Sequence, residues 1–178
     1  MRYIGKIFLL LIVVCLASCQ KNGNEEEKEI EQEDPVVPIN YNLNPEKILR
    51  LVNELRAAGC KCGDTNKPPV PELKWNDRLA KAAYLHCVDM KTHHIFDHTS
   101  SDGRKASDRI TAAGYNYATY GENIARNYTN EDAVIKAWIT SSGHCSNLMS
   151  KDYTNIGAGR DGAYWTMVLA RPASNSGK

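Results

Sequence analysis

Apolar residues recur at helical spacing in the first half of the chain. After Asn44, a capping residue, and Pro45, which suits a first helical turn, they predict a helix that ends before Gly59. A second helix is predicted after Asn76, with a shared face of Leu79, Ala82, Ala83, His86 and Met90. His86 is therefore expected to lie against the core rather than in a functional site.

The middle of the chain predicts two shorter helices. Ser107 is expected to cap one that ends at Gly114, and residues 129–132 are expected to open another that ends at Gly143. Its inward-facing residues are Val134, Ala137 and Trp138. The stretch 59–71, with its three prolines, is predicted to be a loop.

Strand patterns follow late in the sequence. Residues 154–160 and 163–170 predict two strands, and the Asp161-Gly162 pair between them is a strong hairpin signal. A further strand is expected near residues 120–125. Early helices and late strands together predict an α+β fold, with an antiparallel sheet covered by helices.

The first residues have the pattern of an export signal. Residues 1–18 combine a short basic head with an apolar run too short for a membrane span of about 20 residues. The Leu-Ala-Ser-Cys sequence that ends at Cys19 resembles the lipobox of bacterial lipoproteins, so Cys19 is expected to carry a lipid that anchors the protein to the membrane. An ordinary signal peptide with a chance cysteine is the alternative.

Residues 19–38 are strongly acidic and have few apolar side chains, which predicts a solvated tether. An acidic run after a lipidated cysteine resembles a surface-export signal and favours an outer-membrane or cell-surface location, although a plain spacer is equally compatible. Residues 39–178 have the size of one domain. Their excess of basic residues is mild and forms no stripe, so nucleic acid is not an expected partner.

Three polar stretches each present one proton-binding side chain beside a glycine or a turn former. These side chains are His98, Glu122 and His144, and we expect them to converge at the rim of one cleft. Tyr120 and Asn123 are expected to line the same cleft as ligand-binding residues. The spacing of His94 and His98 is that of a zinc protease, but Ile95 stands where that motif needs glutamate. No serine or cysteine has the surroundings of a catalytic nucleophile.

Export would place four cysteines in an oxidising compartment. Cys60 and Cys62 are two residues apart in an extended stretch, so we expect them to point to opposite sides and not to bond to each other. One of them is expected to bond Cys145, and closing a loop of about 80 residues could contribute roughly 4 kcal/mol. Cys87 either bonds the other or stays a buried thiol. A zinc site made of these cysteines fits poorly, because their spacing lacks a second close pair.

An ordered set of short motifs resembles the CAP superfamily (cysteine-rich secretory proteins, antigen 5, pathogenesis-related 1), whose domain is also called SCP. The motifs span roughly residues 45–172 and lie at 51–56, 73–80, 98–100, 121–124, 138, 143–149, 156–159 and 164–166. The resemblance implies a secreted bacterial member with a three-layer α/β/α sandwich and a central, mainly antiparallel sheet.

In CAP relatives, the residues that match His98, Glu122 and His144 belong to a tetrad of two histidines and two acidic residues. The second acid commonly lies three residues after the tryptophan matched by Trp138, and this chain has Ser141 there. The remaining trio could hold Zn²⁺ or Mg²⁺ with an open position, bind a polar ligand, or act as general acid and base, so these three residues are also the catalytic candidates. No cofactor is required, and the missing acid weakens the metal site.

Relatives bind sterols and other lipids, metal ions or partner proteins, and protease or nuclease activity has been proposed for some. The resemblance therefore leaves three functions open. The first is a lipid-anchored binding module for a lipid, a glycan or a protein. The second is a metal-dependent, peptidase-like hydrolase of the cell envelope, and the third is a structural envelope lipoprotein without a working site.

Overall fold

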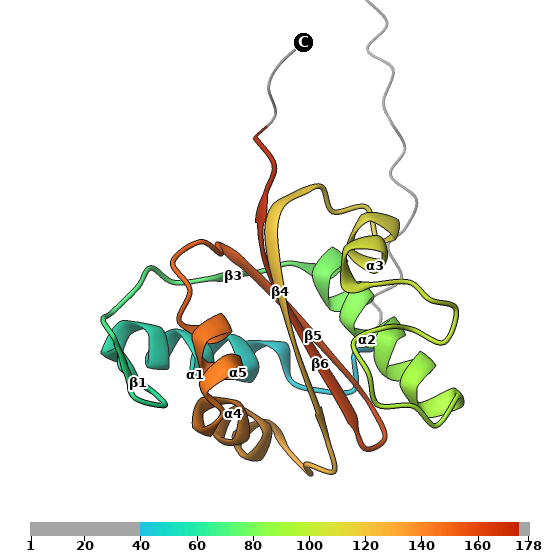
Figure 1. The fold of residues 1–178 in the computed structure, drawn as a ribbon, viewed down its shortest axis with the longest axis horizontal. Coiled ribbons are helices and arrows are strands. Elements are labelled where there is room, and N and C mark those ends of the chain that lie inside the picture. Colours follow the sequence, from blue (N-terminus) through green and yellow to red (C-terminus); the bar gives the residue numbers. More distant parts are fainter. Residues whose placement is uncertain (1–39, 175–178) are drawn as a thin grey trace, which may run out of the picture. The chain divides into compact units, whose positions relative to one another are not determined.

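The computed structural model describes residues 40–174 (Figure 1). The expected signal segment 1–18, the lipidation site Cys19 and the acidic tether lie outside the described residues. Within the described range the helices are α1 (Pro45–Ala58), α2 (Asp77–Thr92), α3 (Ala106–Ala112), α4 (Glu131–Thr140) and α5 (Ser142–Leu148). None of these helices has both the length and the apolar character that a membrane span needs.

The strands form two sheets. A small antiparallel hairpin consists of β1 (Cys60–Cys62) and β2 (Thr65–Lys67), inside the stretch predicted to be a loop. The main sheet contains β3 (Lys74–Trp75), β4 (Tyr117–Arg126), β5 (Asn155–Asp161) and β6 (Tyr164–Pro172), in the order β3-β5-β6-β4. Only β3 and β5 run parallel. The expected mainly antiparallel sheet, including the β5–β6 hairpin, is confirmed.

The main sheet lies between two helical layers, with α2 and α3 on one face and α1, α4 and α5 on the other (Figure 1). Strand β6 shows why both faces are covered, because its side chains alternate between them. Trp165, Met167 and Leu169 belong to the core with α1 and α4, whereas Val168 and Ala170 pack against α2 and α3. The predicted three-layer α/β/α sandwich is therefore confirmed.

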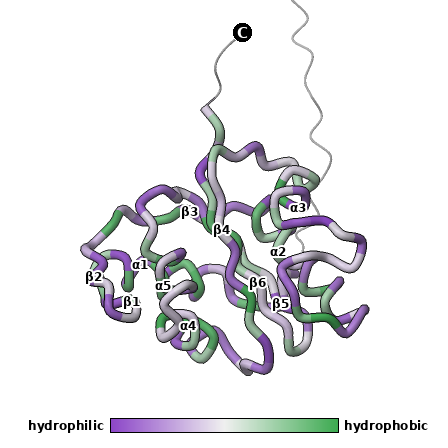
Figure 2. Tube along the Cα trace, viewed as in Figure 1, coloured by the Kyte–Doolittle hydropathy of each residue, from purple (hydrophilic) through white to green (hydrophobic). Residues whose placement is uncertain are grey.

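Hydrophobic and hydrophilic residues alternate in patches along α1 and α2, as expected for helices with one buried side (Figure 2). On the buried side of α2, two glycines of β5 allow a very close approach between the helix and the sheet. A Cβ atom at Gly157 would collide with the backbone of Ala80, and one at Gly159 would collide with the backbone of Tyr84. Glycine at these positions therefore sets the distance between α2 and the sheet.

Local sequence signals located most helix starts correctly. The side chains of Asn44 and Asn76 cap α1 and α2 as predicted, and α4 opens within the expected stretch 129–132, where the Asn130 side chain caps it. The cap predicted for α3 was wrong: the helix begins at Ala106, because the Asp108 carboxylate accepts a hydrogen bond from the Lys105 backbone N–H (2.8 Å).

The end predicted for α4 was also wrong. The helix stops at Thr140, and Gly143 lies within the separate helix α5. Ser141, which has extended backbone angles, is the residue between them. The chain therefore changes direction two residues before the glycine, and His144 lies on a helix rather than in a loop.

Candidate functional site

A cleft of about 640 Å³ follows the outer edge of the main sheet. Its floor is the end of β4, an edge strand that pairs only with β6 in the described sheet, together with the residues just after it. One wall is the loop after α2, with Phe96, Asp97 and His98. The opposite wall comes from α4 and α5, with Trp138 and His144. The two histidines therefore reach one cleft from opposite helical layers.

Glu122 links the first wall to the sheet. Its buried side chain is only 4% exposed, and its Oε1 accepts a hydrogen bond from Nδ1 of His98 (2.8 Å). Its Oε2 accepts one from Nη2 of Arg109 on α3 (2.6 Å), whose side chain is equally buried. Arg109 also donates through Nη1 to the backbone carbonyl of His98 (3.0 Å). Arg109 therefore neutralises the carboxylate and fixes the backbone that carries His98.

Sequence reasoning missed Arg109, because no motif marks it. The signal that could have found it is indirect: a buried carboxylate needs a cationic or strongly hydrogen-bonding partner. His86 completes this polar region, since Nε2 of its ring donates to the Asp97 carbonyl (3.0 Å) and Nδ1 faces the Ser100 hydroxyl (3.4 Å). It is buried and lies outside the cleft lining, as expected for a core histidine.

The charges of this wall shift two pKa values in opposite directions. The hydrogen bond to Glu122 raises the pKa of His98 above its ordinary value, although partial burial opposes the shift. Burial alone would raise the pKa of Glu122, but the hydrogen bond from His98 and the charge of Arg109 lower it overall. The His98 side chain is still 56% exposed, so a ligand in the cleft can reach the ring.

His144 is held differently. Its backbone carbonyl accepts a hydrogen bond from the Asn123 amide (3.1 Å), and Asn147 on the same helix donates to the Asn123 side chain (2.9 Å). Within the described residues, its ring has no hydrogen-bond partner. Burial lowers the pKa of His144, and the charge on His98 lowers it further. The pKa values of the two imidazoles in the cleft are therefore shifted in opposite directions, so His98 keeps its proton to a higher pH than His144 does.

Three of the residues predicted to bind ligand do not line this cleft: Glu122, which lies buried behind His98, and Tyr120 and Asn123. Neighbouring residues on a strand point to opposite faces, so Asn123 points away from Glu122 and is fully buried against α5. The Tyr120 ring packs edge to face on Tyr117, with 4.9 Å between ring centroids, beside the core under α2 and α3. Asn123 supports the site from outside it by holding α5, whereas Tyr120 belongs to the core.

The outer edge of β4 is closed to an added strand over much of its length. Three successive edge carbonyls accept side-chain hydrogen bonds: Tyr120 from Tyr153 (3.1 Å), Glu122 from Asn147 (3.3 Å) and Ile124 from Trp138 (3.2 Å). A peptide that paired with this edge would have to displace them. Recognition in the cleft therefore falls to side chains rather than to the strand backbone.

The proposed metal set fits this geometry poorly. Both oxygens of Glu122 and Nδ1 of His98 are already engaged, and the positive charge of Arg109 lies beside the carboxylate. Ser141 lines the cleft at the position of the second acid and offers only a hydroxyl. Among the described residues, the one His, Cys, Asp or Glu group with ligand atoms all within 4.8 Å of one another is Cys60, Cys62 and Cys145. His98 and Glu122 thus form a hydrogen-bonded group with Arg109, and His144 stands apart from it, so the three predicted residues are not a preformed metal site.

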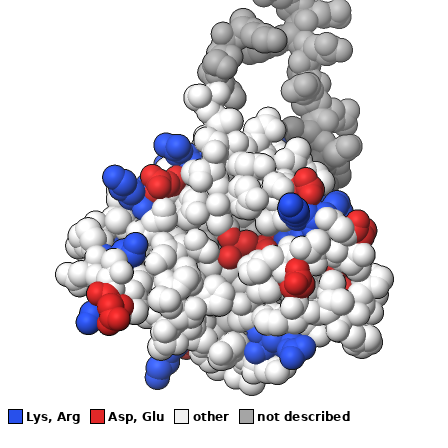
Figure 3. Space-filling model, viewed as in Figure 1, with Lys and Arg blue, Asp and Glu red and all other residues white. Residues whose placement is uncertain are grey.

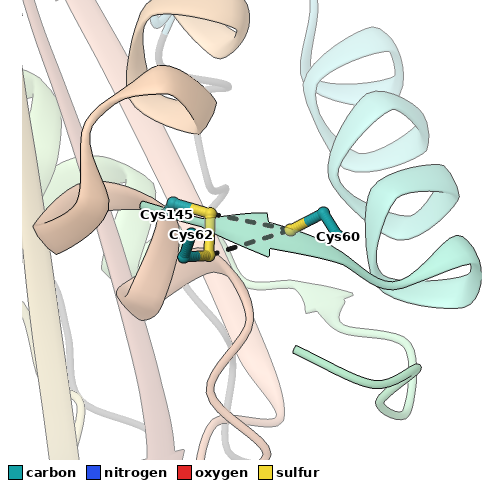
Figure 4. A group of neighbouring side chains, drawn as sticks. All are labelled: Cys60, Cys62 and Cys145. Atoms are coloured by element: carbon teal, nitrogen blue, oxygen red, sulfur yellow. Dashed lines mark hydrogen bonds between the residues drawn. A yellow bond between two sulfur atoms is a disulfide. The ribbon is translucent and has the colours of Figure 1, made fainter. Parts of the chain in front are cut away.

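The cysteine group is a crosslink with a third sulfur beside it. Cys62 of β1 is bonded to Cys145 of α5, with 5.4 Å between the Cα atoms. This confirms the prediction that either Cys60 or Cys62 bonds Cys145. The expectation that Cys60 and Cys62 point to opposite sides was wrong, because residues two apart on a strand share a face. Their sulfurs lie 3.7 Å apart (Figure 4).

Cys87 is free and fully buried in α2. Its thiol donates to the Gly159 carbonyl and the Thr166 hydroxyl, both at 3.2 Å. Burial raises its pKa to about 12, which keeps the thiol protonated and unreactive. Of the two fates expected for Cys87, the structure shows the buried thiol.

Comparison with known proteins identifies the domain. The model of the CAP family, described as the cysteine-rich secretory protein family, matches residues 49–166. The chain belongs to the CAP family. Its CAP domain is 33% identical over 120 residues to YlbC, an uncharacterized membrane protein of Bacillus subtilis, and 31% identical over 131 residues to YkwD of the same organism. These matches cover 67% and 72% of this chain, but only 32% and 48% of the relatives.

Solved structures show the same fold. An extracellular protein with an SCP domain from Bacillus anthracis is 28% identical, with a TM-score of 0.64 over 71% of this chain and 39% of that one. An outer surface protein of Borrelia burgdorferi is 19% identical, with a TM-score of 0.58 over 72% of this chain and 89% of that one. The second likeness concerns the fold alone.

Proposed function

We propose that this protein is an extracytoplasmic, lipid-anchored CAP module that binds a ligand in the cleft between His98 and His144. The observation that carries the proposal is the pair of imidazoles with opposite pKa shifts on facing walls of one cleft. The anchor rests on the lipobox-like sequence at Cys19. The location agrees with the extracellular Bacillus anthracis relative.

The lining of the cleft defines the chemistry of the ligand. His98 donates a hydrogen bond or attracts negative charge when protonated, whereas neutral His144 offers a ring nitrogen as an acceptor. Arg126 adds a cation stacked on Phe96 at 5.3 Å, and the acidic residue in the lining is Asp97. A ligand with an anionic or hydroxyl-bearing group and an apolar part suits this surface. A lipid headgroup, a glycan and a peptide carboxylate all offer such a group.

Titration of the purified protein followed by amide NMR tests this proposal. The probes are glycerol phosphate, a peptidoglycan digest, Zn²⁺ and Mg²⁺. We expect an organic probe to cause saturable chemical-shift changes around the cleft. The affinity for that probe should fall at least about tenfold in both His98→Ala and His144→Ala. A tenfold loss corresponds to roughly 1.4 kcal/mol, the amount expected for one good polar contact. His93→Ala is the matched control, because His93 lies at the end of α2 outside the cleft lining.

The outcomes separate the candidate functions. Probe binding that survives both cleft substitutions would place the ligand elsewhere and overturn the proposal. Saturable Zn²⁺ binding that both substitutions abolish would instead favour the metal-dependent hydrolase. We regard the hydrolase as the less supported function, because Glu122 is committed to Arg109 and His98 and Ser141 stands at the position of the second acid. A structural lipoprotein would bind none of the probes.

A further inference from the structure

Cys60 is a free thiol placed against an existing disulfide. Its Sγ lies 3.6 Å from Sγ of Cys145 and 3.7 Å from Sγ of Cys62, and the three side chains face one another (Figure 4). Met149, Leu55 and Val70 pack around this group. Cys62 and Cys145 are buried, whereas Cys60 is partly exposed. A thiol in van der Waals contact with both sulfurs of a disulfide is close enough for thiol–disulfide exchange, which begins when the Cys60 side chain rotates from this side-on position into line with the bond that breaks.

We propose that Cys60, Cys62 and Cys145 form a thiol–disulfide exchange site, in which Cys60 can replace Cys62 as the partner of Cys145. The Cys60 thiol loses its proton to solvent, and its thiolate forms a bond to Sγ of Cys145. The Cys62–Cys145 bond breaks, and its electron pair leaves on Sγ of Cys62, which takes up a proton. One disulfide and one thiol are present before and after, so no oxidant or reductant is consumed.

Strand geometry selects Cys145 as the sulfur that is shared. A bond between Cys60 and Cys62 would join residues two apart on β1, whose Cα atoms are separated by about 6.6 Å in an extended strand, at the upper limit for a disulfide. Exchange at Cys145 instead keeps α5 tied to β1 through either cysteine. The helix that carries His144 thus stays crosslinked to β1. The free thiol is at partly exposed Cys60 before the exchange and at buried Cys62 after it.

The crosslink can be mapped in the full chain, because Lys61 separates the two cysteines. Trypsin places Cys60 in peptide 57–61, Cys62 in peptide 62–74 and Cys145 in peptide 137–151. The wild type is incubated without reductant in mildly alkaline buffer, quenched with acid, treated with a maleimide and digested without reduction. Mass spectrometry then measures how much of peptide 137–151 is linked to each partner, with Cys60→Ser and Cys62→Ser treated in parallel.

We expect both linkages in the wild type, only the link to Cys62 in Cys60→Ser, and a link between Cys60 and Cys145 in at least half of the Cys62→Ser molecules. A wild type that contains only the Cys62–Cys145 link, whatever the incubation time, would overturn the proposal. So would a folded Cys62→Ser protein whose Cys60 and Cys145 both remain free. If Cys62→Ser does not fold, the linkage ratio in the wild type decides alone.

Discussion

The two walls of the cleft carry the same type of side chain but hold it by different means. On one wall, His98 is fixed by charge, through buried Glu122 and Arg109. On the other, His144 lies on a helix fixed by a disulfide and by an amide contact to Asn123, with no charged partner at its ring within the described residues. The first arrangement raises the pKa of its histidine, and the second lowers it.

This difference shows how one residue type can supply two chemical properties within a single cleft. A carboxylate partner favours the imidazolium, whereas burial without a partner favours the neutral ring. On the face shown in Figure 3, basic and acidic side chains are scattered and form no large patch of one charge. The two walls should therefore respond to different perturbations: the His98 wall to a loss of charge and the His144 wall to a loss of the crosslink.

The largest effect is expected from Arg109→Met, which removes the charge that pairs with Glu122. Breaking a buried ion pair by removing one partner typically costs about 3–5 kcal/mol, because the remaining charge stays buried. Urea unfolding would measure the free energy of unfolding. Arg104→Met is the control, because its ion pair with Asp102 is half exposed and is worth no more than about 1 kcal/mol. Equal losses in the two variants would show that the His98 wall does not depend on this pair.

The His144 wall is tested by Cys145→Ser, which removes the crosslink between β1 and α5. The disulfide joins residues 83 positions apart, and its loss is expected to cost about 2–4 kcal/mol in urea unfolding. The pKa of His98 should stay unchanged by NMR, because the other wall keeps its ion pair. Cys62→Ser should lose less stability than Cys145→Ser, since Cys60 can take its place. A shift in the pKa of His98 would show that the crosslink also maintains the geometry of the His98 wall.

The sequence predicted features that depend on local spacing. The caps at Asn44 and Asn76 and the Asp161-Gly162 turn are decided by a few neighbouring residues, and they are present as predicted. Arg109 could not be foreseen in the same way, because its role depends on a carboxylate thirteen residues later on another element. Long-range pairing of this kind is set by the packing of the layers.

Two errors came from strand geometry rather than from missing information. The two-residue period of a strand places Cys60 and Cys62 on one face of β1, and it places Asn123 on the face opposite Glu122. Applying that period to 60–62 and 120–125 would have grouped the three sulfurs and removed Asn123 from the cleft. The location of the cleft itself, around the outer edge of β4, requires the order of the strands, which no local pattern contains.

A smaller effect is expected from Glu122→Gln, a substitution that tests the charge of Glu122 without changing its shape. Glu122→Gln keeps the size of the side chain but removes its charge, so the pKa of His98 should fall, as measured by NMR titration of the ring. In the wild type, the stability from protonated His98 is full below pH 6.5 and is lost as the pH rises through its raised pKa. That pH-dependent loss should weaken in the variant. Asp97→Asn, a weaker contributor to the same shift, should lower the pKa less.

At low pH, protonation of Glu122 changes stability in the opposite direction: the protein loses stability as the pH falls. The lowered pKa of Glu122 means that its contribution is present above pH 4.5 and is lost as the pH falls through its folded value. Glu122→Gln should therefore also flatten the loss of stability in acid, measured by urea unfolding across that range. A variant that keeps the wild-type slope would show that another carboxylate dominates acid unfolding.

The smallest expected effect is that of His98 on the pKa of His144, the histidine on the opposite wall of the cleft. The charge on His98 contributes to the lowered pKa of His144, after burial, so His98→Ala should raise the pKa of His144 without restoring its ordinary value. NMR titration of the His144 ring measures this change, and His93→Ala should leave it unaltered. A pKa that does not move in His98→Ala would mean that the two rings do not sense each other. The cleft would then hold two independent binding groups rather than a coupled pair that can share a proton with one ligand.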